Sequence, residues 1–222
     1  MQLSKKSIDA IIAFEVTSPE YYEKHYQNPT WPGGDSGVTV GIGYDLGQNT
    51  RETIIMDWTG NVNLNFVSLM ANLAGITGEA AKAKITGLVK GIIVPYSAAY
   101  NVFVNNTLPR FCKAALHVYP GLDKLNPDTQ GAIVSLVYNR GNGFGVEGKP
   151  SWDSRAEMRE LAPLIEAGDY EGIAATIDKM KRLWVGKQDM AGLIDRREVE
   201  AKLITDSLTS SDQLTGAHIF NV

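Results

Sequence analysis

The stretch Ile8-Asp-Ala-Ile-Ile-Ala-Phe-Glu15 decides how this chain begins to fold. Ile8, Ile11 and Ile12 are spaced i, i+3 and i+4, which places them on one face of a helix over residues 4–15. Glu15 follows at i+7 on the same face, so an ionisable carboxyl ends a helix face that otherwise faces an apolar core. Apolar surroundings favour the protonated form of a carboxyl group, which can then act as a general acid. The alternative is a Glu15 that turns to solvent or pairs with a buried arginine.

A glycine-rich stretch over residues 33–47 is the second informative segment. Six of its fifteen residues are glycines, and several of them alternate with valine and isoleucine. This pattern predicts a tight β-hairpin whose backbone comes close to another group. A nucleotide-binding loop is not favoured, because the glycine after Gly41 and Gly43 is Gly47 and no Gly-Lys-Ser/Thr occurs. The simpler interpretation is that Thr39 and Asp45 serve only the turns.

The rest of the chain has mainly helical patterns. Asn49, with Glu52 three residues later, predicts a capped helix to about residue 58, and Asn126-Pro127 predicts the start of a helix over 127–140. Pro109 should kink a long helical pattern that runs from residue 95 to about 117. Further helices are expected near 62–74, 78–90, 154–167, 170–184 and 190–208, with a glycine loop over 141–150.

Three blocks of the sequence resemble a known family. The first is the helix ending in Phe14-Glu15 together with Thr39-Val-Gly-Ile-Gly-Tyr-Asp45. The second is Ala132-Ile-Val-Ser-Leu-Val-Tyr-Asn-Arg-Gly141, and the third is Ala191-Gly-Leu-Ile-Asp-Arg-Arg-Glu-Val-Glu-Ala-Lys-Leu203. In this order they resemble blocks of the phage-type lysozymes, glycoside hydrolase family 24, and most closely the pesticin-like muramidase branch.

The resemblance implies a fold and a domain organisation. The expected fold is mainly α (α+β) and lysozyme-like, with two lobes and a cleft between them. Residues 1–222 would form a single catalytic domain, with a small β-ribbon lobe over about 15–60 and a larger helical lobe from the remainder. Residues 209–222 are expected to be a polar, loosely held tail.

Roles for individual residues also follow from the resemblance. Glu15 matches the general acid of the family, and Thr39 matches the threonine that positions water or sugar. The commonest phage lysozymes carry an aspartate six residues before that threonine, where this chain has Gly33. The pesticin-like branch carries it six residues after, which is Asp45 here. Asp45 is therefore the preferred second carboxylate, and Asp35 is held in reserve.

Three further residues are expected to contact the substrate. Tyr44 replaces the histidine of the common phage motif and could stack on a sugar or pack the ribbon. Asn139 and Arg140 end the helix before the glycine loop, which the resemblance places near the sugar site. The alternative for this pair is a helix cap with a surface arginine.

Composition narrows the classes of partner and cofactor. The net charge of −4 and the absence of a basic stripe with aromatics argue against a nucleic-acid partner. The lone Cys112 lies in an apolar context, which predicts a buried thiol, and the three histidines have no ligand spacing, so no metal or cofactor is expected. The basic residues between 179 and 197 are interleaved with acids, which favours a solvated face over an anion site.

The expected place of action follows from the same sequence and the resemblance. We expect no membrane insertion and no signal peptide, and hence synthesis in the cytoplasm. We also expect the protein to be a monomer. The implied substrate is the glycan strand of peptidoglycan, which the enzyme would reach through a holin, a secretion machine or lysis. An immunity protein is the further partner that a delivered antibacterial enzyme would need.

The leading hypothesis is thus an N-acetylmuramidase, acting as a phage endolysin or a delivered antibacterial enzyme. A chitinase- or chitosanase-like glycosidase is an alternative with a similar helix-borne glutamate. A lytic transglycosylase would need only the glutamate. A non-catalytic cell-wall-binding phage module is the alternative from another class, but it has no need for Glu15, Thr39 and an acid on the ribbon together.

Overall fold

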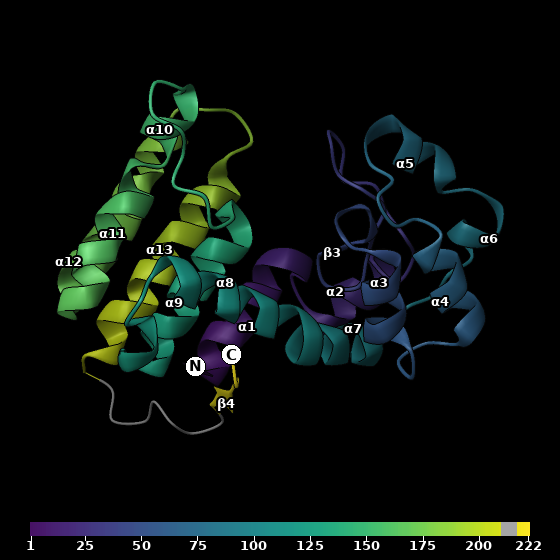
Figure 1. Ribbon diagram of the computed structural model, residues 1–222, viewed down its shortest axis with the longest axis horizontal. Helices are drawn as coiled ribbons and strands as arrows, with labels where there is room; N and C mark the ends of the chain where they lie inside the picture. Colours follow the sequence, from purple (N-terminus) through teal and green to yellow (C-terminus); the bar gives the residue numbers. More distant parts are fainter. Residues whose placement is uncertain (210–216) are drawn as a thin grey trace. The chain divides into compact units, whose positions relative to one another are not determined.

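The computed structural model describes residues 1–209 and 217–222, and it is mainly helical, as the sequence predicted (Figure 1). The chain divides into two compact units. Unit 1 comprises Met1–Phe14 and Pro109–Val222, and unit 2 comprises Glu15–Leu108. Within the described residues each unit contains one small antiparallel pair of strands. The unit that holds the ribbon thus extends to Leu108, well beyond the boundary near residue 60 that we expected for a small lobe.

The first helix, α1 (Lys5–Val16), has the apolar face that its spacing predicts. Ile8, Ile11 and Ile12 are all buried. The chain passes from unit 1 to unit 2 between Phe14 and Glu15, inside the last turn of this helix. Thr17 follows with a φ of 66°, a left-handed conformation that a β-branched residue rarely adopts.

The core of unit 1 is built around α9 (Pro127–Arg140), which begins as predicted. The Asn126 side chain accepts a hydrogen bond from the Thr129 backbone at 2.9 Å, and Pro127 occupies the first turn. Every residue from Pro127 to Val137 is buried. A Cβ at Gly131 would lie 1.9 Å from the Ser7 hydroxyl, so only glycine allows α1 to come this close to α9.

The remaining helices of unit 1 pack on α9 and on one another. Figure 1 shows α11, α12 and α13 side by side, and α13 contacts both α9 and α12. The additional helical elements of the unit are α8 (Leu108–Val118), η3 (Leu122–Lys124), α10 (Pro150–Ser154), α11 (Ala156–Ala167), α12 (Tyr170–Lys179), η4 (Met180–Leu183) and α13 (Ala191–Ser207).

A buried polar network fixes α13 on α9. One oxygen of Glu200 accepts from the Ser135 hydroxyl at 2.6 Å and from the Arg197 guanidinium at 2.9 Å. Arg196 also lies 3.4 Å from this oxygen, and all four side chains are buried. The one carboxylate of Glu200 is shared by two buried guanidinium groups, so the arginines of the third sequence block have a structural role.

The last residues of the chain are held in unit 1. Strand β1 (Gln2–Leu3) pairs antiparallel with β4 (His218–Ile219), and the Phe220 N–H donates to the Met1 carbonyl at 2.8 Å. The Phe220 side chain is buried. The predicted loosely held tail is therefore wrong for residues 217–222, and its part over 210–216 lies outside the described residues. Figure 1 shows the two labelled ends of the chain near each other.

Unit 2 is a continuous segment of short helices around the predicted hairpin. Strands β2 (Thr39–Val40) and β3 (Tyr44–Asp45) pair antiparallel. Helix α3 (Arg51–Trp58) is capped by the Thr50 hydroxyl, which accepts from Thr53, and not by Asn49 as predicted. Its other helical elements are α2 (Pro19–His25), η1 (Leu46–Gln48), α4 (Leu64–Ala71), α5 (Gly78–Lys84), α6 (Gly87–Lys90), α7 (Tyr96–Val102) and η2 (Phe103–Thr107).

The helical pattern around Pro109 is interrupted one turn earlier than the proline itself. The π-helical segment η2 separates α7 from α8. A proline ring clashes with the carbonyl four residues before it, here that of Asn105, and Pro109 has no N–H to donate. The wider π turn absorbs this local mismatch.

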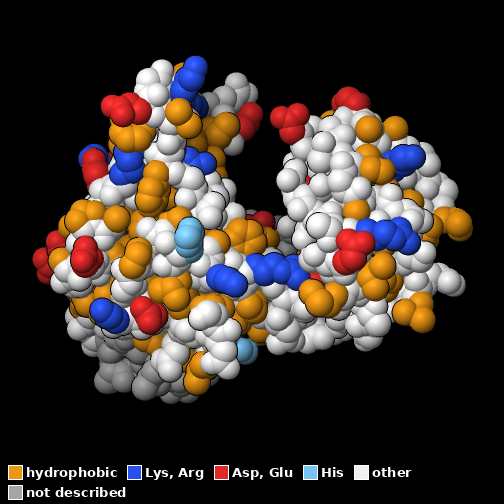
Figure 2. Space-filling model, in the orientation of Figure 1, with side chains coloured by type: hydrophobic (Ala, Val, Ile, Leu, Met, Phe, Trp, Pro, Cys, Tyr) orange, Lys and Arg blue, Asp and Glu red, His pale blue; other side chains and the backbone are white. Residues whose placement is uncertain are grey.

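Surface character agrees with the composition. On the face drawn in Figure 2, basic and acidic side chains are interspersed over both units. Among residues 1–209 and 217–222, no helix has the length and apolar character that crossing a membrane requires.

Candidate active site

A cavity of about 550 Å³ in unit 2 brings together the main candidate residues. Glu15, Thr39 and Asp45 all line it, and every lining residue belongs to this unit. The remaining lining residues are Val16, Tyr26, Thr30, Trp31, Pro32, Ser36, Gly41 and Gly43. The cavity therefore joins the end of α1 to the glycine-rich ribbon.

Three polar side chains form a row across the ribbon. Thr39 lies directly opposite Asp45 in the β2–β3 pair, and on its other side it forms a bridge with Thr30. Thr30 and Thr39 exchange two backbone hydrogen bonds of 3.0 and 2.8 Å. Directly opposed residues of antiparallel strands project to the same side, so Thr30, Thr39 and Asp45 present their side chains together.

The Asp45 carboxylate also holds the ribbon together. Its two oxygens lie 3.1 and 3.0 Å from the Gly37 nitrogen, and one of them accepts from the Gly47 N–H at 2.8 Å. A Cβ at Gly37 would lie 2.3 Å from this carboxylate, and a Cβ at Gly47 would lie 2.4 Å from the Ile76 carbonyl. Glycine is therefore needed at positions 37 and 47, because the backbone at these two positions approaches both the Asp45 carboxylate and the other glycine.

The tip of the hairpin uses glycine for a different reason. Gly41 and Gly43 have φ angles of 61° and 63°, which residues with a side chain rarely adopt. Ile42 between them is buried, and the Trp58 ring lies so close to Gly41 that a Cβ there would be 2.9 Å away. This tip fixes the strands that carry Thr39 and Asp45.

Glu15 reaches the cavity from the last turn of α1. It is partly exposed, while Ile12 and Val16 beside it on the helix are buried. A carboxyl group held at the end of a helix and facing a cavity can exchange a proton with a molecule bound there. The predicted position of Glu15, at the boundary between an apolar face and a polar site, is thus present.

Asp35 and Tyr44 are placed differently from what was expected. Asp35 is exposed in the turn after Gly34, and in the described chain it does not line the cavity. Tyr44 is buried, its hydroxyl donates to Asp57 at 2.7 Å, and its ring meets the Trp58 ring edge-on at 5.4 Å. Tyr44 therefore packs the ribbon and is removed from the residues that could contact a sugar.

The structure adds lining residues that sequence reasoning did not assign to the site. Thr30 joins the polar row, and Tyr26 and Trp31 supply aromatic surface. The indole N–H of Trp31 donates to the Ser36 carbonyl at 3.0 Å, and the Lys82 ammonium lies 5.0 Å from the centre of its ring. Trp31 had a signal in the sequence as an aromatic before the ribbon, whereas Thr30 had none, since its role depends on pairing with Thr39.

Asn139 and Arg140 line a second cavity, of about 420 Å³, formed by residues of unit 1. The Asn139 carbonyl oxygen accepts from Arg197 at 3.3 Å, and Arg140 donates to the Ser154 carbonyl at 2.5 Å. The first cavity therefore does not include the two residues that we expected beside the sugar.

Within residues 1–209 and 217–222, no cluster of three or more His, Cys, Asp or Glu side chains could hold a metal ion. Cys112 is buried as predicted, and its burial raises the pKa of the thiol to about 12, so it stays protonated.

A family model matches part of the chain. The sequence model of a family described as "Domain of unknown function (DUF8812)" matches residues 10–106. No curated protein matches the chain. The matched segment nearly coincides with unit 2, at Glu15–Leu108, and it contains every residue that lines the first cavity.

Proposed function

We propose that this protein is a glycoside hydrolase that degrades peptidoglycan, an N-acetylmuramidase with lysozyme activity. The observation that carries the proposal is that Glu15, Thr39 and Asp45 line one cavity. Hydrolysis of a glycosidic bond requires an acid that protonates the leaving oxygen and a second polar group that organises water or stabilises the sugar cation. The helix end supplies the first group, and the ribbon supplies the second.

The roles follow from where the side chains are held. Glu15 is the general acid. The Thr39 hydroxyl and the Asp45 carboxylate stand side by side on the ribbon, where they can orient the attacking water. Asp45 keeps its position because backbone N–H groups from both Gly37 and Gly47 bind it. Its structural and chemical roles are therefore compatible, since a fixed carboxylate is better placed to orient water.

The proposal includes a lysozyme-like fold for the chain. It is supported by the mainly helical structure, the small antiparallel ribbon after the first helix and the order of the three sequence blocks. Action as a phage endolysin or as a delivered antibacterial enzyme would follow from this fold and substrate.

The test is digestion of purified peptidoglycan by the wild type and by single variants, with product masses. We expect the wild type to release reducing muropeptides. Glu15→Gln should lower the rate by at least about 100-fold, because it removes the transferable proton. Thr39→Val should lower it by about tenfold or more, and Thr39→Ser, which keeps the hydroxyl, should retain most of the activity.

Asp35→Asn is the matched control for Asp45→Asn. Both changes remove one carboxylate from the same ribbon, but only Asp45 lines the cavity. We expect Asp45→Asn to lose activity and Asp35→Asn to keep it, with circular dichroism showing that both are folded. A Glu15→Gln variant as active as the wild type would contradict the proposal. Products ending in anhydro-muramic acid would identify a transglycosylase instead.

A further inference from the structure

The second cavity, in unit 1, is positively charged. Arg140, Arg155 and Lys187 line it, together with Asn139, and among the described residues none of its lining side chains is acidic. The other lining residues are Ser154, Leu183, Trp184 and Leu193. The three cations around this cavity of about 420 Å³ repel one another, and a bound anion would offset that repulsion.

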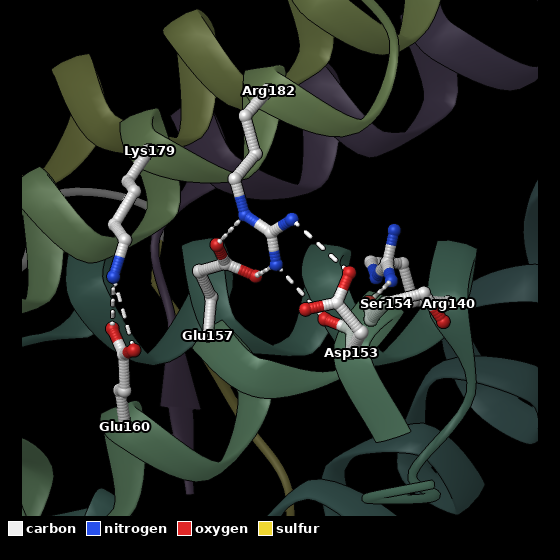
Figure 3. A network of polar contacts seen from close by, with 7 residues as sticks. All are labelled: Arg140, Asp153, Ser154, Glu157, Glu160, Lys179 and Arg182. Atoms are coloured by element: carbon white, nitrogen blue, oxygen red, sulfur yellow. Dashed lines mark hydrogen bonds and ion pairs between the residues drawn. The ribbon is translucent and has the colours of Figure 1, made fainter. Parts of the chain in front are cut away.

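The acidic residues near this cavity are already paired with other cations. Figure 3 shows Arg182 between Glu157 and Asp153, whereas Arg140 donates to the backbone carbonyl of Ser154. The Arg182 guanidinium binds Glu157 through two nitrogens and lies 3.6 Å from an Asp153 oxygen. Glu157 and Asp153 thus form their direct ion pairs with Arg182 and not with the cations that line the cavity.

The two arginines of the cavity bind backbone oxygens instead. Arg140 donates to the Ser154 carbonyl at 2.5 Å, and Arg155 donates to the Gly141 carbonyl at 3.5 Å. Neither forms an ion pair within residues 1–209 and 217–222. Burial is the main cause that lowers the pKa of Arg140 to about 10; the charges of Arg155 and Arg197 act in the same direction, and those of Glu157 and Glu200 act in the opposite one.

We propose that the second cavity binds a phosphate group. Arginine and lysine together recognise the oxygens of phosphate, and three lining cations match a dianion better than the single charge of a carboxylate. Trp184, Leu183 and Leu193 form an apolar wall that suits the uncharged part of a phosphorylated molecule. The Arg140 guanidinium lies 5.0 Å from the centre of the Trp184 ring, so the charged and apolar sides adjoin.

This site is independent of the proposed hydrolysis, because Glu15, Thr39 and Asp45 do not line it. The experiment is isothermal titration calorimetry of the full chain at pH 7 and constant ionic strength. The probes are inorganic phosphate, glucose 6-phosphate and acetate. Arg155→Gln and Lys187→Gln each remove one cation from the cavity, and neither residue pairs with a carboxylate, so both variants should fold.

Lys202→Gln is the matched control, since Lys202 is exposed on α13, pairs with Asp206 and does not line this cavity. We expect saturable binding of phosphate that weakens by about tenfold or more in Arg155→Gln and Lys187→Gln and is unchanged in Lys202→Gln. Tighter binding of glucose 6-phosphate would assign the phosphate to a sugar-linked ligand, and equal binding would assign it to free phosphate. Absence of saturable binding, equal binding by all variants, or binding of acetate as tightly as phosphate would overturn the proposal.

Discussion

At the scale of single residues, Gly37 and the Asp45 carboxylate are in close contact in the ribbon. The Gly37 nitrogen lies within hydrogen-bonding distance of both carboxylate oxygens. This contact explains why a site residue and a glycine eight positions earlier depend on each other. A methyl group at position 37 has no space, because its carbon would lie 2.3 Å from Asp45 and 2.4 Å from the Gly47 nitrogen.

We therefore expect Gly37→Ala to displace Asp45. The overpacked ribbon should lower the free energy of unfolding by about 1–3 kcal/mol, and peptidoglycan digestion should fall with it. Gly143→Ala is the control, because a Cβ at Gly143 would meet no atom within 4 Å. Urea unfolding and muropeptide release measure the two effects. An alanine at position 37 that leaves both unchanged would mean that the ribbon does not hold Asp45 in this way.

Strain at Thr17 belongs to the same scale. Thr17 directly follows α1, two positions after Glu15, and its backbone conformation costs about 1–3 kcal/mol for a residue other than glycine. The surrounding structure must compensate for that cost, since the chain turns here from the helix toward α2. The position of Glu15 relative to the ribbon thus depends on a turn that glycine would form more readily.

At the scale of elements, local signals predicted helices and the hairpin well. The i, i+3, i+4 spacing of isoleucines gave α1, and Asn126-Pro127 gave the start of α9. Thr39-Val-Gly-Ile-Gly-Tyr-Asp45 gave a hairpin because glycines with positive φ form its tip. In each case the information lies within a few residues of the element.

Pairings between distant segments were not predictable in the same way. Thr30 lies beside Thr39 only after the chain turns back on itself, and Tyr44 points into the core because its strand neighbour Asp45 faces the cavity. The basic residues near 180 were expected to form a solvated face, and Lys179 and Arg182 are indeed exposed; the pairing of Arg182 with the buried Glu157 was not predicted. Lys187 lines the second cavity together with Arg140, which ends α9 more than forty residues earlier in the sequence.

Helix α8 contains Cys112, the single cysteine of the chain, and the reactivity of its thiol measures how well this helix is packed. Burial raises the pKa of Cys112 from an ordinary 9 to about 12, so the reactive thiolate is suppressed in the folded protein. The corresponding stabilisation is complete below about pH 9 and is lost as the pH rises toward 12.

We expect Ellman's reagent at pH 8 to label native protein at least about 100-fold more slowly than protein in guanidinium chloride. Free cysteine under the same two conditions serves as the reference for the effect of denaturant on the reagent. Complete labelling of the native protein within minutes would contradict the burial of this thiol.

At the scale of the whole molecule, unit 2 is formed by one continuous segment of the sequence, whereas unit 1 is formed by two segments. The candidate active site lies in unit 2, and the family match nearly coincides with that unit. Unit 1 is assembled from both ends of the sequence, and the pairing of β1 with β4 joins them. Its stability should therefore depend on residues far from the helices that form its core.

We expect Phe220→Ala to lower the free energy of unfolding of unit 1 by about 3 kcal/mol, because the buried ring leaves a cavity. Val222→Ala is the control, since Val222 lies two residues later and is 42% exposed. Hydrogen exchange of the unit 1 helices measures the effect. Equal protection in the two variants would show that the last residues contribute little to the unit.

The pairing of Gln2 with Ile219 has a consequence for biosynthesis. All of unit 2 is translated before residues 109–222, so the ribbon and its cavity can form while these later residues are still being added. Strand β1 precedes unit 2 in the sequence but has no partner until residues 218–219 are translated. The nascent chain therefore carries an early, complete unit 2 and a unit 1 that closes late, and translation pauses between these two points would leave strand β1 unpaired for longest.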